Sequence, residues 1–365
     1  MRKQALRIGL AGAAGLALVG ALGLSGCSNL GYYWQSVSGH LQIMSAARPV
    51  DELLREPLTP ERLRQRLELA RRIRAFAVTA LKLPDNASYR RYADLHRGAA
   101  IWNVTAAPPY SLELKTWCFP VTGCVGYRGY YHERDAQAEA ARVAREGYET
   151  GVYPVPAYST LGLMNWAGGD PLLNTFLGYP EGELAGLIFH ELAHQLIYVK
   201  GDTTFNESFA TAVERLGAGQ WLAAQAGEPA RREYAAYEGR RKLFQTLVRR
   251  TRGQLDALYR QPGLTPQEKD EGKGRVLAQF RAHYARMKEG AGGDPLAWRG
   301  YDRWVREANN AWFGAQAAYD ELVPGFERLF HAEGGDWTRF YDAVRQLAAL
   351  PMQERHRRLK EAPVG

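Results

Sequence analysis

The feature that most constrains the fold of this chain is His190-Glu191-Leu192-Ala193-His194, with Glu207 following after twelve intervening residues. Residues four apart on an α-helix lie one above the other, so both imidazoles project from one face and can bind one metal ion. Glu191 is angled towards the same site. A second helix that returns antiparallel brings Glu207 back beside the histidines. The sequence therefore predicts two packed helices with a His2Glu metal site between them.

Apolar residues surround this motif. Nearly all sides of the segment 184–197 carry Leu, Ile, Phe or Ala, which is typical of a helix at the centre of a domain. Polar groups buried there need partners, because an unpaired polar group costs free energy when it leaves water. A metal ion is one such partner, and backbone or carboxylate groups are the alternative. The turn at 201–204 follows, with Thr203 or Thr204 expected to cap the second helix.

Glu207 lies in Phe205-Asn206-Glu207-Ser208-Phe209-Ala210. This segment resembles the Leu-Asn-Glu-Gly-Phe-Ala stretch that supplies the glutamate ligand in aminopeptidase-N-like gluzincins. The spacing from the histidines is shorter here, so the connecting loop must be tighter. Glu214 lies two turns further along the same helix face. It is a candidate partner for a ligand histidine, and a solvated charge or a salt-bridge partner is the alternative.

The N-terminus has the pattern of an export signal. Three basic residues precede an uncharged apolar run over 8–26, which stops at Leu24-Ser25-Gly26-Cys27. This resembles a bacterial lipoprotein signal, which implies that residues 1–26 are removed and that Cys27 is acylated. An uncleaved anchor is the alternative, although the run barely reaches the length of a membrane span. Ser28 after the cysteine implies sorting to the outer membrane, so we expect a lipid-anchored domain on its periplasmic face.

Cys118 and Cys124 are the remaining cysteines. The residues between them include Pro and Gly and suit a hairpin-like loop, which a disulfide can close in an oxidising compartment. A metal-binding pair is the alternative, with only His132 close by in the sequence. We expect the disulfide, because the export signal places the domain in an oxidising space.

The charge pattern gives no reason to expect a nucleic-acid partner. The formal net charge of +8 falls by three when the basic residues of the signal are removed. The remaining charges are scattered along predicted helices, and no nucleic-acid-binding motif accompanies them. About 340 residues remain after processing, enough for one large domain or two smaller ones.

The rest of the N-terminal half predicts helices around a strand-rich section. Thr59-Pro60-Glu61 opens an amphipathic helix that ends before Pro84. Short β-favouring runs follow over 99–131, and a helix over 136–144 comes next. The segment 152–162 predicts extended chain that its prolines confine to a sheet edge. Such an edge binds substrate backbone by strand addition in zinc peptidases, and a plain connecting edge is the alternative.

The C-terminal third predicts further helices. Residues 230–260 and the segment opened by the capping box Thr265-Pro266-Gln267-Glu268 are expected to form a helical hairpin. The segment 302–330 then mixes aromatic residues with amides at helix-like spacing. Most of these aromatic residues are expected in the core. Asn310 and Tyr319 are the polar members that we expect in a cleft.

The whole mature chain resembles a family of bacterial envelope proteins described as predicted aminopeptidases. The resemblance rests on the lipoprotein start, residues 118–131 and 156–162, the two metal-site segments, and Asn309-Asn310-Ala311 leading to Tyr319. It implies a metallopeptidase more firmly than an exopeptidase. We therefore expect a mainly α (α+β) protein with a gluzincin-type, zincin-like metallopeptidase core, a small sheet and long helical additions.

The expected organisation is a signal peptide over 1–26 and one zinc metallopeptidase domain over 27–365. Within the domain, the strand-rich part is expected at about 99–162, the metal helices at about 180–225 and a helical C-terminal part at about 230–365.

The expected reaction is zinc-dependent hydrolysis of peptide bonds in the cell envelope, by an aminopeptidase. His190, His194 and Glu207 are the expected ligands of Zn²⁺, which lowers the pKa of a water molecule and polarises the scissile carbonyl. Glu191 is the expected base, which accepts the water proton and passes it to the leaving amine.

The donor that stabilises the oxyanion is expected elsewhere in the chain. We predict Tyr319 for this role, with Tyr158 on the presumed edge strand as its chief competitor. Two other functions remain open: an endopeptidase of the same mechanism, and a non-catalytic envelope lipoprotein that binds metal. Glu191 argues against the second, because a structural metal site does not need it.

Overall fold

The computed structural model describes residues 31–119, 122–290 and 294–361, apart from the side chains of residues 318–320. The chain divides into two compact units, Met1–Ala46 and Ala47–Gly365. In the first unit, residues 31–46 form a helix. None of the helices described here is long and apolar enough to cross a membrane. The predicted signal and Cys27 lie outside the described residues.

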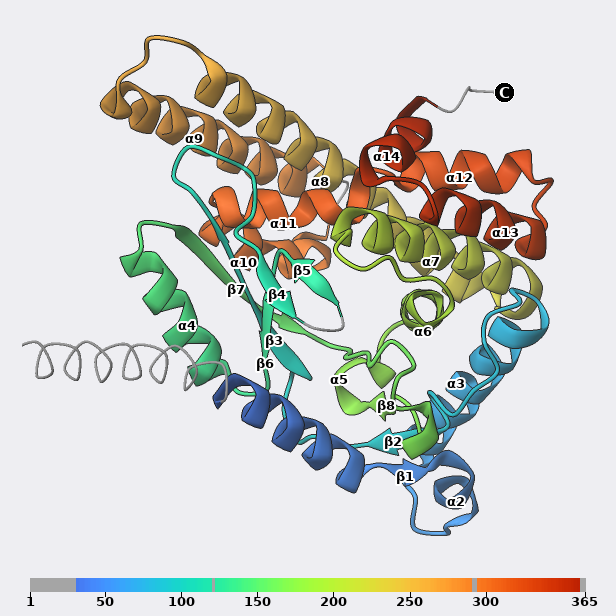
Figure 1. The fold of residues 1–365 in the computed structure, drawn as a ribbon. Coiled ribbons are helices and arrows are strands. Elements are labelled where there is room, and N and C mark those ends of the chain that lie inside the picture. The colour runs from blue at the N-terminus through green and yellow to red at the C-terminus, as the bar shows by residue number, and fades with distance from the viewer. Residues whose placement is uncertain (1–30, 120–121, 291–293, 362–365) are drawn as a thin grey trace, which may run out of the picture. The chain divides into compact units, whose positions relative to one another are not determined.

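The longest strands of the second unit form an antiparallel sheet. Its order is β6 (Arg128–Tyr130), β3 (Ile101–Ala107) and β7 (Glu149–Val155). α4 (Glu133–Arg145) and α11 (Asn310–Asp320) both pack against β3 and β7, and Figure 1 shows them on either side of this sheet. Among the described strands β7 pairs only with β3, so the prediction of an edge strand is confirmed for residues 152–155, whereas the chain from 156 to 162 is not a strand.

The outer edge of β7 is already hydrogen-bonded. Asn309 Nδ2 donates to Thr150 O (2.9 Å) and Arg303 Nη2 donates to Val152 O (3.0 Å). Pro154 has no N–H to offer. An added strand would need these same backbone groups. The structure therefore favours a connecting edge, and strand addition by a substrate here would require both side chains to be displaced.

Two smaller β-structures complete the strand-rich part. One is a three-stranded sheet of β1 (Arg48–Pro49), β2 (Arg91–Ala93) and β8 (Leu172–Leu173). The other is a hairpin of β4 (Trp117–Phe119) and β5 (Gly123–Val125).

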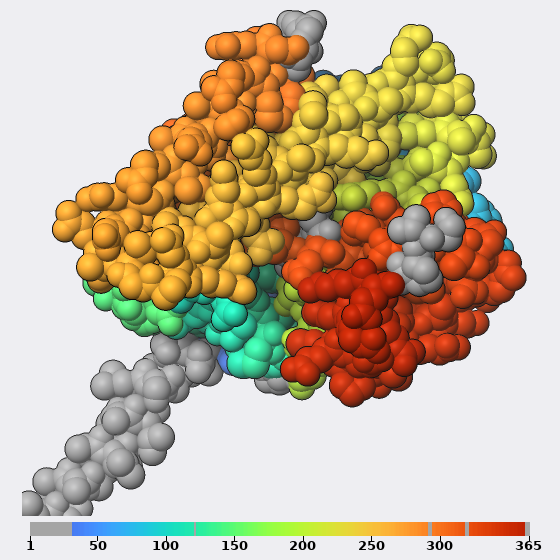
Figure 2. All heavy atoms as spheres, turned by 90° about the horizontal axis from the view of Figure 1, so that it is seen from above, coloured from blue at the N-terminus to red at the C-terminus, as the bar shows by residue number. Residues whose placement is uncertain are grey.

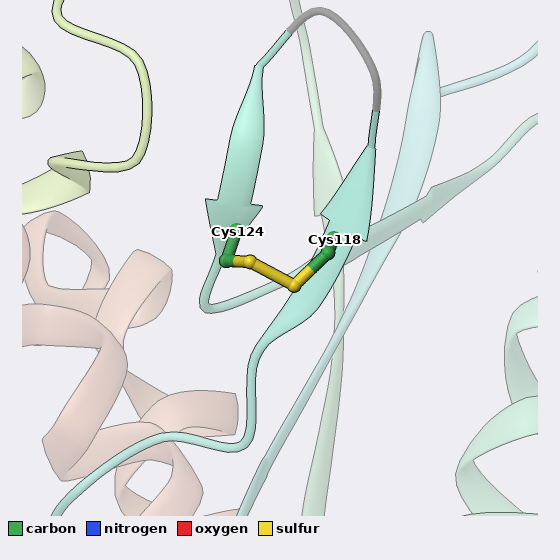
Figure 3. Close-up of a disulfide and its surroundings, with 2 residues drawn as sticks. All are labelled: Cys118 and Cys124. Carbon is green, nitrogen blue, oxygen red and sulfur yellow. A yellow bond between two sulfur atoms is a disulfide. The ribbon is translucent and has the colours of Figure 1, made fainter.

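The β4–β5 hairpin carries a disulfide. Cys118 lies opposite Cys124 in the hairpin, and their sulfur atoms are bonded to each other (Figure 3). Gly201 N donates to Thr122 O (3.0 Å), which ties the hairpin to a segment distant in the sequence. Gly123 has a positive φ of 75°, and a Cβ there would lie 2.8 Å from Gly201 N, so this contact requires glycine.

Helices account for 65% of the structure, so the prediction of a mainly helical protein with a small sheet is confirmed. α6 (Glu181–Leu196) and α7 (Thr203–Gln225) pack along each other. α3 (Glu61–Thr79) packs on α6, and α11 and α12 (Val323–Ala332) pack on α7. The remaining helices are α2 (Val50–Arg55), α5 (Asn174–Leu177), α10 (Arg299–Glu307), α13 (Trp337–Ala348), α14 (Met352–Glu361) and the 3-10 turns Asn165–Ala167 and Pro295–Trp298.

The predicted helical hairpin is present as α8 (Glu228–Arg260) and α9 (Pro266–Gly290), which lie side by side as yellow and orange ridges in Figure 2. The capping box that opens α9 is confirmed. Thr265 N donates to Glu268 Oε2 (2.8 Å), and Glu268 N donates to Thr265 Oγ1 (3.3 Å).

Candidate metal centre

α6 supplies the two histidines from the middle of a buried helix. It begins after Pro180, and its first turn carries Glu181 and Glu183, where the positive end of the helix dipole favours acidic groups. Its apolar residues are almost entirely buried, as the sequence predicts. His190 and His194 therefore lie one turn apart in a region largely closed to water.

α7 begins one residue earlier than the sequence predicts. The helix starts at Thr203, so the cap falls on Asp202, whose carboxylate accepts a hydrogen bond from Phe205 N (3.1 Å). The prediction of a cap at Thr203 or Thr204 is wrong for this reason. Arg355 of α14 also donates to Asp202 (3.2 Å), which fixes the start of α7 to the C-terminal helices.

The three predicted ligand side chains converge. His190 Nε2 and His194 Nε2 lie 3.2 Å apart, and Glu207 Oε2 lies 3.4 Å from the first and 3.5 Å from the second. All three residues are buried, and together they form a group that could hold a metal ion. A tetrahedral ion with bonds of about 2.0–2.1 Å separates two of its donor atoms by roughly 3.3 Å. The donor atoms therefore already have the spacing that such an ion requires.

The charges of this cluster also suit a cation. Burial raises the pKa of Glu207, but the His194 and His190 rings outweigh it and bring that pKa down to about 2. Burial lowers the pKa of His190, but hydrogen bonds to Glu207 and Glu214 outweigh it and raise that pKa to about 10. The carboxylates thus stabilise a positive charge at the imidazole nitrogens. A bound metal cation can supply that charge in place of a proton.

Glu214 orients His190, which is the role the sequence left open for it. Its Oε2 lies 3.1 Å from His190 Nδ1, and its Oε1 accepts a hydrogen bond from Arg241 Nη1 (3.0 Å). Arg241 in turn forms a salt bridge with Glu238 of α8. Gly186 leaves space for this arrangement, because a Cβ there would lie 3.0 Å from Glu214 Cγ. A carboxylate on Nδ1 fixes the tautomer that leaves Nε2 free for a metal.

Glu191 lies beside the cluster and makes no hydrogen bond among the described residues. Burial raises the pKa of its carboxyl, His190 and His194 oppose this, and the charges of Glu207 and Glu214 add to the rise. A carboxylate with a raised pKa is a stronger base than an exposed one. Its position and its pKa both suit the transfer of a proton.

The charge of Glu207 acts on three tyrosines that the sequence analysis did not single out. The pKa of Tyr127 is raised well above its usual value by burial and then by the charge of Glu207. Burial and the same carboxylate raise the pKa of Tyr153 and of Tyr198 to about 12. The ring of Tyr198 also packs edge-on against His194. The only sequence signal for any of the three is the position of Tyr198, one turn after His194.

The structure gives Asn310, which the sequence analysis expected in a cleft, and its neighbour Asn309 structural roles. Asn310 is fully buried, and its amide donates to Pro108 O and Pro109 O (2.9 and 2.8 Å). Asn309 caps α11 by accepting from Ala311 N (3.0 Å). The expectation that Asn310 lies in a cleft is therefore wrong, because its side chain is buried and its amide is used to hold the fold together.

The two tyrosines proposed for the oxyanion are placed differently. Tyr319 belongs to α11, and its side chain lies outside the described part of the structure. The ring of Tyr158 packs against Tyr131, and burial is the main cause that raises its pKa, followed by the nearby Tyr131 and Asp170. Tyr158 thus faces other groups than the metal cluster.

A family-level comparison gives the class of this protein. The model of the family described as Putative aminopeptidase matches residues 31–359, so the chain belongs to this family. Membership in a family so described indicates a peptidase that acts on peptides. Neither a curated protein nor a solved structure matches the chain.

Proposed function

We propose that this protein is a zinc-dependent metallopeptidase of gluzincin type that hydrolyses peptide bonds in the cell envelope as an aminopeptidase. The observation that carries the proposal is the convergence of His190 Nε2, His194 Nε2 and Glu207 Oε2 at 3.2–3.5 Å from one another. Two imidazoles, one carboxylate and tetrahedral spacing are typical of catalytic zinc. The packed α6–α7 pair with a small sheet also supports a zincin-like core.

His190, His194 and Glu207 would hold zinc, which would act as a Lewis acid on the scissile carbonyl. Glu191 takes the proton of the attacking water and delivers it to the leaving amine. Burial of the site excludes bulk water, which strengthens every charge interaction within it. Glu214 holds the His190 ring in place throughout, because its hydrogen bond is on the nitrogen that faces away from the other ligands.

Tyr319 remains our predicted oxyanion donor, and the structure adds Tyr127 as its strongest competitor. Tyr153 shares a hydrogen bond with Asn103, and Tyr198 shares one with Asn206. Tyr127 has no such partner among the described residues, and after burial the charge of Glu207 contributes most to raising its pKa. A neutral phenol there can donate to a developing oxyanion.

Replacing each candidate phenol in turn identifies the donor. The Tyr→Phe change at the true donor should lower kcat by roughly two to three powers of ten, with zinc content and melting temperature unchanged. Normal activity in Tyr319→Phe beside a large loss in Tyr127→Phe would move the role to Tyr127. Normal activity in both would show that neither phenol serves it.

The metal assignment is tested with two substitutions. Glu207→Ala should lose zinc, whereas Glu191→Gln should retain zinc and abolish turnover. Zinc content is measured in purified protein, and turnover with a peptide library. Equal metal affinity in the Glu207 variant and the parent would show that the ligand assignment is wrong. Full turnover by Glu191→Gln would exclude Glu191 as the base.

The same library separates the remaining functions. Release of single N-terminal residues supports an aminopeptidase, and internal cuts identify an endopeptidase of the same mechanism. Zinc binding without cleavage of any peptide would identify a non-catalytic metal-binding lipoprotein. Our proposal predicts the first result.

We further propose that the mature domain, residues 27–365, is anchored by lipid at Cys27 on the periplasmic face of the outer membrane. The Cys118–Cys124 disulfide supports this location, because disulfides persist in oxidising compartments. Cys27→Ala should incorporate no labelled palmitate, since a thiol is the acceptor that such a signal offers. Incorporation equal to that of the parent would contradict the anchor.

A further inference from the structure

The loop from 159 to 169, between β7 and β8, carries two exposed apolar side chains. Leu163 is 56% exposed and Trp166 is 82% exposed. Single exposed apolar side chains are common on protein surfaces, but aromatic residues are enriched where proteins bind other molecules.

Asp170, at the end of this loop, fixes it to the metal helix. The carboxylate is 1% exposed and accepts hydrogen bonds from Thr160 N and Thr160 Oγ1 (3.0 and 2.7 Å), which belong to the loop. It also accepts one from Gln195 Nε2 (3.0 Å). Gln195 directly follows His194, so one buried carboxylate joins the loop to a residue adjacent to the metal cluster.

A second connection lies directly beside Trp166. Ser88 Oγ donates to Asn165 Oδ1 (3.0 Å) and accepts from Gln195 Nε2 (3.1 Å). Trp166 therefore directly follows Asn165, which is linked to Gln195 through the Ser88 side chain. Gly162 also lies near Gln195, because a Cβ at Gly162 would be in ordinary van der Waals contact with Gln195 Oε1 (3.5 Å). The loop is thus held on α6 at several points around Gln195.

We propose that Leu163 and Trp166 form an apolar surface at the rim of the metal site that binds a side chain of the peptide substrate. The surface fits substrates with an aromatic or long aliphatic residue near the scissile bond. Asp170 is the positioning residue of this surface, because it holds the loop without contacting the substrate. The inference rests on the proposed peptidase function and deepens it.

The loop presents different chemical groups on its two sides. On the side that faces α6, Asp170, Ser88 and Gln195 are hydrogen-bonded to one another. What the loop offers outward is apolar area. A substrate whose backbone reaches the metal cluster places its neighbouring side chains within reach of this area, and burying apolar area there stabilises the complex.

The test compares two sets of quenched peptides that differ only in carrying Leu and Phe or Gly and Ser around the cleavage position. Trp166→Ala should raise KM for the Leu and Phe set by about ten-fold and leave the Gly and Ser set within about two-fold. Zinc content should not change. Leu296→Ala is the control, because Leu296 is another exposed leucine (64%) that lies outside the loop, and it should have no effect.

Asp170→Asn separates positioning from direct contact. It should raise KM for the Leu and Phe set as Trp166→Ala does, while kcat and zinc content are retained. Combining the two substitutions should add little, because both remove the same surface. Fully additive effects on KM would contradict the positioning role of Asp170.

Peptide binding distinguishes a failure of this inference from a failure of the proposed function. In a Glu191→Gln background, a fluorescein-labelled Leu- and Phe-containing peptide should bind, and Trp166→Ala should weaken that binding even if the parent cleaves no peptide. Unchanged KM and unchanged peptide binding in Trp166→Ala would overturn the inference. So would a loss confined to the binding of phosphatidylethanolamine and phosphatidylglycerol vesicles, which would assign the loop to a lipid surface.

Discussion

Replacing Glu214 with Gln isolates the contribution of one hydrogen-bonded carboxylate to metal affinity. Both oxygens of Glu214 face donors: Oε2 faces His190 Nδ1 at 3.1 Å, and Oε1 faces Arg241 Nη1 at 3.0 Å. Gln has nearly the same shape but only one oxygen. Whichever way its amide turns, an NH2 group must face either the imidazole N–H or the guanidinium, so one donor loses its acceptor.

The expected loss in zinc affinity is 10- to 100-fold, the range for partners of a ligand histidine, which corresponds to about 1.4–2.7 kcal/mol. The loss should fall in the upper part of this range if the amide turns its NH2 group towards His190. Arg241 keeps its salt bridge with Glu238 in either case, so the fold around α8 should remain.

Zinc affinity is measured by competition with a chromophoric chelator at constant pH. Glu181→Gln is the control, because Glu181 lies on α6 and accepts a hydrogen bond from Trp221 Nε1 (3.0 Å) without touching a ligand histidine. It should bind zinc as the parent does. Parental affinity in Glu214→Gln, together with an unchanged melting temperature, would refute the reasoning that Glu214 orients His190 for the metal.

Two further predictions concern the loop that Asp170 holds. Burial raises the pKa of Asp170 from 3.8 to about 6, so the folded state holds the proton more tightly than the unfolded state. The stability that the protonated carboxyl contributes is therefore complete below about pH 4 and is lost as the pH rises through about 6. The free energy of unfolding should fall by about 3 kcal/mol in all over this range. Asp170→Asn removes this pH dependence. Denaturant unfolding should therefore show that the parent loses stability relative to the variant as the pH rises across that range. A difference in the free energy of unfolding that does not change with pH would contradict the raised pKa. Gly169→Ala should destabilise by more than about 2 kcal/mol, because φ is +67° and the new Cβ would lie 2.5 Å from Ser88 N. Gly147→Ala, with φ +90° and open space around it, should cost only about 1 kcal/mol, and equal losses at both glycines would show that the contact with Ser88 is unimportant.

The sequence predicted those parts of the protein that depend on neighbours in the chain. Helix periodicity alone aligns His190 with His194, and the buried apolar residues of α6 follow from the same pattern. The capping box before α9 and the proline-bearing edge strand β7 are also local, because each depends on the chemistry of a few consecutive residues. These predictions need no knowledge of how distant segments meet.

Only the tertiary structure decided which groups meet across the chain. In the structure Glu214 contacts His190, the charge of Glu207 acts on Tyr127, and Asn309 donates a hydrogen bond to the outer edge of β7. None of these contacts has a sequence period, because each joins segments whose relative position is set by packing of helices and sheet.

The difference has one physical cause. A helix fixes the direction of its side chains within a turn, so the alignment of a histidine pair such as His190 and His194 is specified by spacing alone. The role of a residue such as Asp170 depends on folding, because folding buries its carboxylate and removes water from it. The hydrogen bonds from Thr160 and Gln195 then replace those to water. The sequence by itself thus determined the ligand geometry within α6, and packing determined what surrounds it.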